Sequence, residues 1–475
     1  MVFASLIFLF LFLPLNLLLY YSTKNAMWRN VLLIAFSLFF YGWGEPIWIT
    51  LMIFSATVDY VNGRVIEKYR GKIGAKIGLV VSIIINLGLL ATFKYSGFIV
   101  ENVNDIFGTS FGLPHFALPI GISFYTFQTI SYSVDVYRNE VKAQKSFLKF
   151  LMFVSLYHQL VAGPIVRYSH IADEIDNRKE KLSDISKGLS RFCIGLFKKV
   201  VIANVAAELV RKYMGDNSDP LTMTELSSLA TGAAWLGLVM FAIQIYFDFS
   251  GYSDMAIGLG WMFGFHYHEN FKYPYTATSV SDFWRRWHIS LGTFFKDYVY
   301  IPMGGNKKRI YFNLFVVWFL TGMWHGASWN FIFWGLYFFV FISLEKAFIL
   351  RFLKKIPRFF SHVYALLIII PGWVIFYFTD TQILGAYVAK LFSFGSGEGW
   401  NSELTSDLTN HLFWLIFAII CCMPVYHKVK DWFELQLKRP TAFELVTVGV
   451  NVGCIFLCVA QLVGKSYNPF IYFRF

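Results

Sequence analysis

The chain has 475 residues, of which 57% are hydrophobic, 20% aromatic and 15% charged, and its mean hydropathy is +0.53. This composition excludes an ordinary water-soluble domain, in which about a quarter of the residues are charged. The net charge of +12 resides in short basic loops between apolar segments, a pattern that indicates membrane topology and argues against nucleic-acid binding. The five cysteines lack the spacing of a zinc site or a disulfide framework, so we expect them to be buried small hydrophobic residues.

Apolar segments long enough to cross a membrane recur along the chain. The first, residues 3–21, has no basic residues before it and no cleavage site after it, which favours a retained span over a signal peptide. Two shorter apolar pieces, 150–163 and 252–264, are expected to be re-entrant or partial. We therefore predict an all-α polytopic membrane protein of roughly eleven membrane helices, in a single integral-membrane domain over residues 1–475. The other predicted spans are 30–60 (two helices), 77–96, 117–136, 189–210, 226–249, 359–378, 411–426 and 444–463.

Loop charge predicts which side of the membrane each connection faces, because short basic loops stay in the cytoplasm. Loops of acidic or neutral character, 101–115, 215–225 and 394–410, are expected to face outward. The basic charges would also attract a phosphate-bearing soluble donor, although orientation alone explains them equally well. The loops predicted to be cytoplasmic are 64–76, 138–149, 167–199, 296–309, 346–358 and 428–439.

The segment 311–344 is apolar, about twice the length of one span, and has basic loops at both ends. It is therefore expected to enter and return on the same side, with the break at residues 322–326. At about 1.5 Å per residue, this places His325 about 20 Å deep.

Two histidines stand in tryptophan-rich apolar runs: His288 in Asp282-Phe-Trp-Arg-Arg-Trp-His-Ile-Ser-Leu291, and His325 in Trp324-His-Gly-Ala-Ser-Trp-Asn330. An ionisable side chain at membrane depth is costly and usually functional, and imidazole is well matched to proton transfer near neutral pH. His288 is expected near the cytoplasmic boundary. A structural histidine bonded to a backbone carbonyl remains the alternative for His325.

Four motifs in order resemble the membrane-bound O-acyltransferase (MBOAT) family: Gln244–Gly258, Glu269–Tyr275, Asp282–Leu291 and Trp324–Asn330. Four more motifs resemble its bacterial alginate O-acetylation branch, so the resemblance covers nearly the whole chain. A sister branch, the teichoic-acid D-alanyl transferases, shares the histidine motifs and is the second choice. The motifs of the alginate branch are Leu118–Gln128, Gln159–Arg167, Tyr300–Gly305 and Asn468–Phe475.

The resemblance implies an MBOAT-type helical bundle in a bacterial inner membrane. It also implies acyl transfer from a cytosolic thioester, with acetyl-CoA as the expected donor and no bound cofactor. The acceptor is a hydroxyl on the outer side, or an extracytoplasmic partner that modifies an exported polysaccharide or cell-wall polymer.

A hydroxyl is a poor nucleophile, so attack on a thioester needs a positioned base, and His325 is assigned that role. His288, the Asn330 amide or nearby tryptophan indoles are expected to stabilise the developing negative charge. Trp284 and Asn330 are also expected to support binding of the donor. The remaining polar residues of the motif are expected to orient His288 or to bind the donor's phosphates, with a structural role equally open. These residues are Asp282, Arg285 and Arg286.

Other readings of the chain remain open. A transporter of lipid-linked saccharides would also carry intramembrane histidines, but it commonly shows matching halves, whereas here the ionisable motifs cluster at 244–330. A noncatalytic scaffold would tolerate loss of both histidines. His266 and His268 make a weak ligand pair, so no metal site is expected. Asp248 and Asp254 are expected to belong to a buried polar network.

Overall fold

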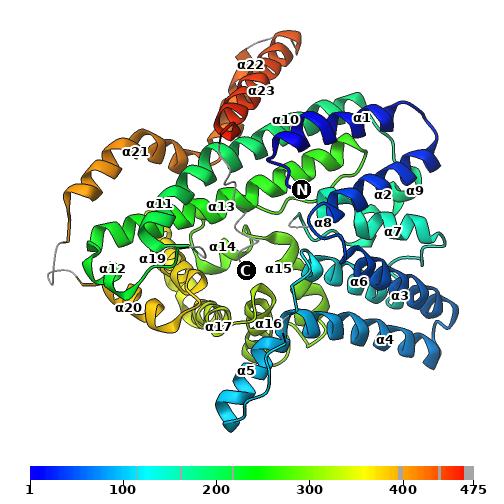
Figure 1. The fold of residues 1–475 in the computed structure, drawn as a ribbon, viewed down its shortest axis with the longest axis horizontal. Helices are drawn as coiled ribbons and strands as arrows, with labels where there is room; N and C mark the ends of the chain where they lie inside the picture. The colour runs from blue at the N-terminus through cyan, green and yellow to red at the C-terminus, as the bar shows by residue number, and fades with distance from the viewer. Residues whose placement is uncertain (115, 161–162, 217–218, 394–398, 437–439, 465–475) are drawn as a thin grey trace. The chain divides into compact units, whose positions relative to one another are not determined.

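The computed structural model describes residues 1–114, 116–160, 163–216, 219–393, 399–436 and 440–464, and every regular element in these ranges is helical (Figure 1). This confirms the predicted all-α class. Residues 161–162 of the motif Gln159–Arg167 and the terminal motif Asn468–Phe475 lie outside the described residues. So do parts of the predicted loops 101–115, 215–225, 394–410 and 428–439.

The chain divides into two compact units. Unit 1 comprises Met1–Cys193 and Tyr252–Glu269, and unit 2 comprises Ile194–Gly251 and Asn270–Phe475. Helices α10 (Leu182–Phe197) and α13 (Thr231–Met262) contribute residues to both units. The single integral-membrane domain over 1–475, with its histidine motifs at 244–330, stays a prediction.

Unit 1 is built from helices in which α3, α4 and α6 pack on one another and α7 packs on α2 and α3. Its elements are η1 (Phe8–Phe12), α1 (Leu13–Tyr21), α2 (Ala26–Gly42), α3 (Ile49–Lys68), α4 (Ile73–Leu90), η2 (Ala91–Tyr95), α5 (Ser96–Phe107), α6 (Ile122–Tyr137), α7 (Phe147–Ser155), α8 (Tyr157–Leu160) and α9 (Tyr168–Asn177).

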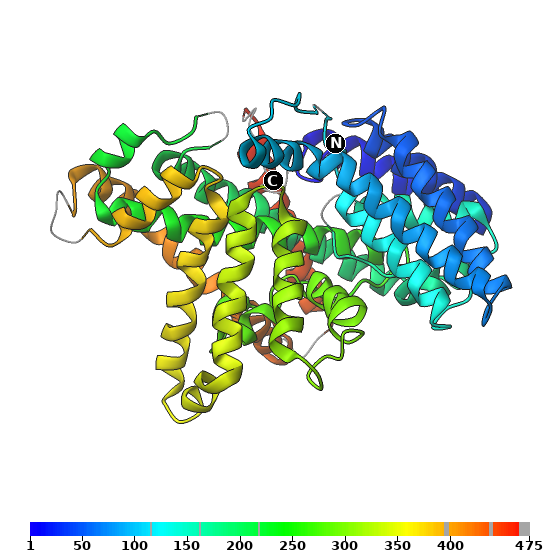
Figure 2. The same ribbon diagram turned by 90° about the horizontal axis from the view of Figure 1, so that it is seen from below.

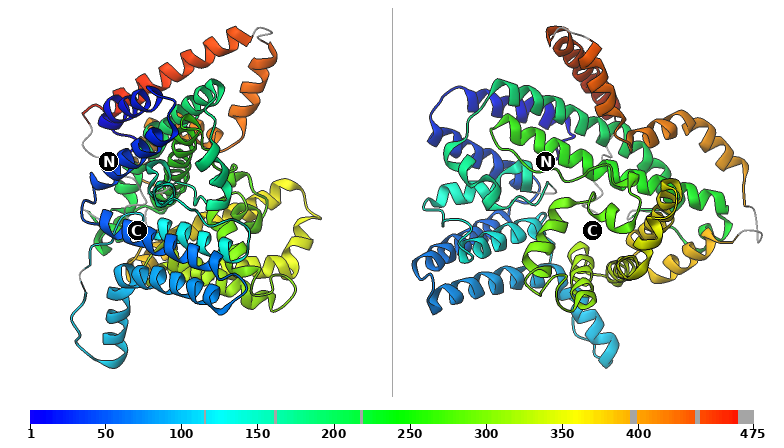
Figure 3. Two further views of the ribbon diagram at one scale, coloured as in Figure 1. Left: turned by 90° about the vertical axis from the view of Figure 1, so that its right-hand side faces the viewer. Right: turned by 180° about the vertical axis from the view of Figure 1, so that it is seen from behind.

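Unit 2 carries both histidine motifs and ends in a helical hairpin, α22–α23, at the red end of the colour scale in Figure 3. Its elements are η3 (Lys198–Ala203), α11 (Asn204–Met214), α12 (Met223–Ser228), η4 (Pro274–Thr276), α14 (Val280–Trp284), α15 (Ile289–Phe295), η5 (Lys296–Tyr300), α16 (Ile310–His325), α17 (Trp329–Leu344), η6 (Glu345–Ile349), α18 (Leu350–Leu353), α19 (Arg358–Tyr377), α20 (Thr381–Leu391), α21 (Ser402–Cys421), α22 (Val425–Gln436) and α23 (Pro440–Leu462).

Six helical stretches of the described chain are long and apolar enough to cross a membrane, and three shorter apolar helices accompany them. The polytopic architecture is thereby confirmed. The predicted spans 117–136 and 189–210 do not meet these criteria, because α6 has only 16 residues and the second segment carries too many charged side chains, at Arg191, Lys198, Lys199 and Glu208. The six stretches are Ile73–Phe107, Thr231–Met262, Trp329–Leu353, Arg358–Tyr377, Ser402–Cys421 and Ala442–Leu462.

The prediction of a span at 226–249 and a separate partial helix at 252–264 is wrong, because α13 runs unbroken over 32 residues. Gly251 does not interrupt it. A Cβ at this position would lie 2.8 Å from the carbonyl oxygen of Gly195, so the glycine permits close helix packing. The carboxylates of this helix are paired as expected: Asp248 with Lys199 at 2.7 Å, and Asp254 with Arg191 at 2.7 Å.

The segment 311–344 forms the predicted hairpin. Helix α16 ends at His325, residues 326–328 make the turn, and α17 begins at Trp329. Helices α16, α17 and α19 pack side by side and appear in light green to yellow in Figure 2. The break therefore places His325 at the closed end of the hairpin.

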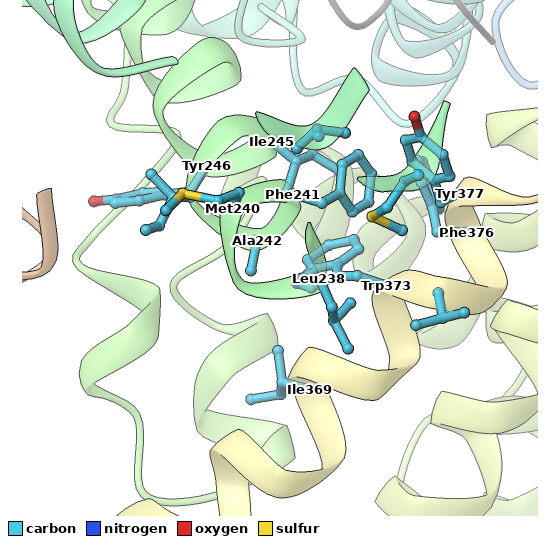
Figure 4. Close-up of a cluster of buried hydrophobic side chains, with 14 of the residues drawn as sticks. Leu238, Met240, Phe241, Ala242, Ile245, Tyr246, Ile369, Trp373, Phe376 and Tyr377 are labelled. Atoms are coloured by element: carbon cyan, nitrogen blue, oxygen red, sulfur yellow. The ribbon is translucent and has the colours of Figure 1, made fainter. Parts of the chain in front are cut away.

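The core of unit 2 forms where α13 meets α19. Figure 4 shows Leu238, Phe241 and Ile245 of α13 facing the side chains of Trp373 and Phe376 from α19. All five are at most 4% exposed. Both helices are long and apolar enough to cross a membrane, where helices are held together by close van der Waals packing, so this core gives the histidine motifs a rigid support.

Candidate active site

His288 occupies the turn between α14 and α15, outside the candidate membrane spans. Its backbone has φ 43°, a left-handed conformation that is uncommon for a residue with a side chain. The residue is 2% exposed, and its ring packs edge-on against Phe249 at 4.7 Å and Trp324 at 5.7 Å. Burial lowers the pKa of His288 to about 3, so the imidazole is neutral at physiological pH.

Asn270 holds this turn from the preceding segment. Its side-chain Oδ1 accepts hydrogen bonds from the backbone N–H of Ser290 at 3.1 Å and from the Ser290 hydroxyl at 2.9 Å. The same oxygen lies 3.2 Å from Nδ1 of His288, and the Asn270 carbonyl accepts the backbone N–H of Ile289 at 2.9 Å. One asparagine therefore fixes both the start of α15 and the orientation of the His288 ring. Sequence reasoning missed it, although it stands inside the Glu269–Tyr275 motif.

His325 is the last residue of α16 and lies among aromatic rings. Its ring is 5.0 Å from that of Trp324, 5.0 Å from Trp334 and 5.2 Å from Phe376, each in an edge-on arrangement. His325 is half-buried. The position of His325 at the end of the hairpin therefore places its imidazole among apolar side chains, where a low dielectric constant strengthens electrostatic interactions.

Trp324 joins the two histidines, because its ring contacts both His288 and His325. The two residues are 37 positions apart in the chain, and the end of α16 brings both rings into contact with this one indole. Trp284 joins the same aromatic cluster through Trp334, with ring centroids 5.3 Å apart. The indole nitrogens of Trp284 and Trp334 are buried and have no hydrogen-bond partner in the described parts of the chain.

Asn330 lies in the first turn of α17 and is fully buried. Its amide nitrogen points to the carbonyl oxygens of Ile375 and Phe376, each at 3.2 Å. It therefore donates to the last turn of α19, which favours the two indoles over this amide as donors to a substrate.

The charged side chains of the motif Asp282–Leu291 differ in their exposure and in the hydrogen bonds that they make. The Arg286 guanidinium donates to Asp282 at 3.1 Å and to Thr276 Oγ1 at 3.4 Å, so it is part of the local structure. Arg285 is 74% exposed on its side chain and only approaches Asp282, at 3.4 Å. Arg285 is thus the cation of this motif that remains accessible to a soluble anion.

Glu345 is a supporting residue that the sequence analysis missed. It is 0% exposed, and its carboxylate accepts the backbone N–H groups of Val280 at 2.6 Å and Ser281 at 2.8 Å. These are the first N–H groups of α14, which lack partners within the helix. The signal available in the sequence was a single acidic residue at the end of the apolar segment 311–344.

The His266 and His268 pair has structural partners. His266 Nδ1 lies 2.7 Å from a Glu174 carboxylate oxygen, and the His268 ring packs edge-on against His170 at 4.4 Å. Both contacts lie within unit 1.

Comparison with known proteins connects this geometry to a family. The model of the membrane-bound O-acyltransferase family matches residues 138–389, more than half of the chain and a range that includes both histidines. The chain belongs to the membrane-bound O-acyltransferase family. It is an acyltransferase and a multi-pass protein of a bacterial inner membrane.

Individual relatives place this O-acyltransferase within the family. A probable alginate O-acetylase AlgI from Pseudomonas putida is 37% identical over 100% of both chains. A peptidoglycan O-acetyltransferase from Helicobacter pylori is 35% identical and covers 73% of this chain and 71% of its own. A teichoic acid D-alanyltransferase from Bacillus subtilis is 27% identical over 46% of this chain and 56% of that protein. The predicted resemblance to the alginate O-acetylation branch is confirmed.

Proposed function

We propose that this O-acyltransferase moves an acetyl group from cytosolic acetyl-CoA towards the hydroxyl groups of an exported polysaccharide or cell-wall polymer. The observation that carries the proposal is the aromatic cluster in which one indole contacts two histidines, His288 and His325. The similarity over the full length of a probable alginate O-acetylase, and the similarity to a peptidoglycan O-acetyltransferase, favour an acetyl group and a polymer acceptor. An extracytoplasmic partner that completes the transfer is part of the proposal.

In the proposed reaction His325 is the general base. Its imidazole accepts the proton of the attacking hydroxyl while the oxygen forms a bond to the thioester carbonyl carbon. The tetrahedral intermediate then collapses, the C–S bond breaks, and the proton passes to the departing thiolate, which leaves as free CoA. A positioned base contributes about 10²–10⁴ in rate, which sets the loss expected when His325 is removed.

The developing oxyanion needs donors in a dry site. The indole N–H groups of Trp334 and Trp284 meet this need, because both are buried and neither has a hydrogen-bond partner among the described residues. Trp334 is in ring contact with His325. Removing one such donor typically costs about 10²–10³ in kcat.

We assign binding of acetyl-CoA to Arg285, the exposed cation of the motif Asp282–Leu291. Arg285 follows Trp284 directly, and its guanidinium is exposed and donates to Asp282 at 3.4 Å, which leaves further N–H groups to bind a phosphate in a bidentate manner. Asp282 and Arg286 hold the turn on which Arg285 and His288 stand.

The test is CoA release from acetyl-CoA by the purified full chain in nanodiscs, supplied with acceptor polymer and the candidate partner. We expect release to fall about 10²-fold or more in His325→Ala and in the similarly sized His325→Gln. The matched control is His411→Gln on α21, a half-buried histidine whose Nδ1 contacts only the Asp407 carbonyl among its recorded hydrogen bonds.

Three outcomes would change the proposal. Release from a D-alanyl thioester and none from acetyl-CoA would move the protein to the D-alanyl transferase branch. Equal turnover in wild type and both His325 variants would remove His325 from the chemistry. A folded wild type that releases no CoA from acetyl-CoA would show that the proposed donor or the supplied partner is wrong.

A further inference from the structure

His288 has one ring nitrogen with a fixed partner and one without. Nδ1 lies 3.2 Å from Oδ1 of Asn270 and 3.4 Å from the Ser290 hydroxyl oxygen, whose own hydrogen is donated to Asn270 at 2.9 Å. Nε2 is buried and has no hydrogen-bond partner in the described ranges. A neutral imidazole carries a single N–H, and the bond made by one nitrogen decides what the other offers. The identity of the Asn270 atom that faces Nδ1 therefore determines the tautomer.

The backbone of Ser290 identifies that atom as the amide oxygen. The oxygen and nitrogen of an asparagine amide are assigned from their hydrogen-bond partners. The Ser290 N–H can only donate, and it points at the same Asn270 atom at 3.1 Å. A reversed amide would place two donors face to face and leave a buried N–H unsatisfied, at about 1–3 kcal/mol. The atom is the oxygen, so Nδ1 of His288 carries the hydrogen.

The surroundings of His288 keep the ring neutral. The rings packed against it, Phe249, Phe271 and Trp324, carry no charge. Because Nδ1 holds the only hydrogen, Nε2 presents a lone pair in an apolar setting. This is the opposite of what an oxyanion donor requires, so the expected role of His288 in stabilising the oxyanion does not fit its geometry.

We propose that Asn270 is a positioning residue that holds His288 in the Nδ1–H tautomer, so that Nε2 accepts a hydrogen bond from the acceptor hydroxyl. The identity of that ligand rests on the proposed acetyl transfer. Of the two reacting groups, a thioester carbonyl and a hydroxyl, only the hydroxyl has a hydrogen to donate. His288 orients the hydroxyl, and His325 removes its proton.

The tautomer is measured directly by solid-state NMR on the full chain in lipid bilayers with ¹⁵N-labelled histidine. The His288 signals are those that disappear in His288→Gln from among the ten histidines. We expect a protonated Nδ1 and an unprotonated, pyridine-type Nε2. A His288 with a protonated Nε2 would overturn the proposal, and so would a doubly protonated ring at neutral pH.

Two variants test the part played by Asn270. Asn270→Asp keeps an acceptor beside Nδ1 but adds a negative charge, which raises the pKa of His288. Since the protonated ring cannot accept a hydrogen bond at Nε2, the acidic limb of the kcat profile should move to higher pH, with activity retained on the alkaline side. Asn410→Asp on α21 is the matched control, because it adds the same negative charge at an exposed asparagine outside the candidate site and should leave the pH profile unchanged.

A pH profile for Asn270→Asp that coincides with that of wild type would refute the positioning role. The two proposals fail separately. Were the tautomer as described but no variant or wild type released CoA from acetyl-CoA, the proposed function would fall while the role of Asn270 in the tautomer stood. If CoA release depended on His325 but His288 carried its hydrogen on Nε2, only the further inference would be lost.

Discussion

The close approach of α16 and α17 depends on Gly335. A Cβ added there would lie 2.4 Å from the carbonyl oxygen of Trp318 and 3.3 Å from the Cα of Gly322. Carbon and carbonyl oxygen make contact at about 3.3–3.6 Å, so Gly335→Ala must push the two helices about 1 Å apart. The opposing atoms belong to the backbone and cannot rotate away.

This displacement would change the geometry of the candidate site, because both helices contribute residues to it. Helix α16 carries His325, and α17 carries Trp334, the residue against which His325 packs. Overpacking of this kind costs about 1–3 kcal/mol of stability. A shift of about 1 Å between reacting groups costs about 10² in rate, so we expect Gly335→Ala to lose more activity than stability.

The assay pairs thermal unfolding in detergent with CoA release in nanodiscs. The control is Gly385→Ala on α20, where an added Cβ meets no heavy atom within 4 Å. That variant should be unchanged or about 0.5–1 kcal/mol more stable, because alanine is the better helix former. Wild-type stability and activity in Gly335→Ala would refute the reasoning that glycine sets the hairpin spacing.

Three further predictions concern supporting residues. Glu345→Gln should destabilise the protein by about 1.5–3 kcal/mol, because the charged acceptor of the α14 N–H groups is lost; equal melting temperatures would contradict this. Arg285→Ala should raise the KM for acetyl-CoA with little change in kcat, whereas Arg285→Lys should restore part of the affinity and Lys428→Ala should have no effect. The capping box of α12 lowers the pKa of Glu225 through its bonds to Thr222, so its contribution to stability is complete above the ordinary value of 4.5 and is lost as pH falls through the lowered pKa. Amide exchange of α12 should therefore accelerate in acid, and Thr222→Ala should remove that dependence.

The hairpin was predictable because its signals are local. Apolar length, flanking basic loops and a Gly322–Gly326 break together require a helix that enters, turns and returns, and the structure places the turn at residues 326–328. The unbroken α13 was not predictable in the same way. Considered alone, Gly251 indicates a break in the helix. Only its contact with Gly195 in the structure shows that this glycine permits close helix packing instead.

The candidate site likewise contains residues that the sequence predicts and residues that only the structure identifies. His288 and His325 stand out because a histidine among tryptophans is costly without a role. Asn270 acts through a contact with His288, 18 positions away, and Glu345 through a contact with Val280, 65 positions away, and no periodicity links these pairs. The tautomer of His288 follows from the hydrogen bond that the backbone N–H of Ser290 donates to Asn270. No sequence pattern predicts that bond.

The left-handed backbone of His288 is held in place by the packing of its own side chain. A residue with a side chain is destabilised by about 1 kcal/mol or more in this conformation, and glycine would adopt it freely. The ring is buried against Phe249 and Trp324, however, so its removal would leave a cavity, and a large-to-small change in a packed core costs about 2–5 kcal/mol. Relief of backbone strain therefore does not favour glycine at this turn, and a search for thermostable forms of this enzyme has nothing to gain from changing His288.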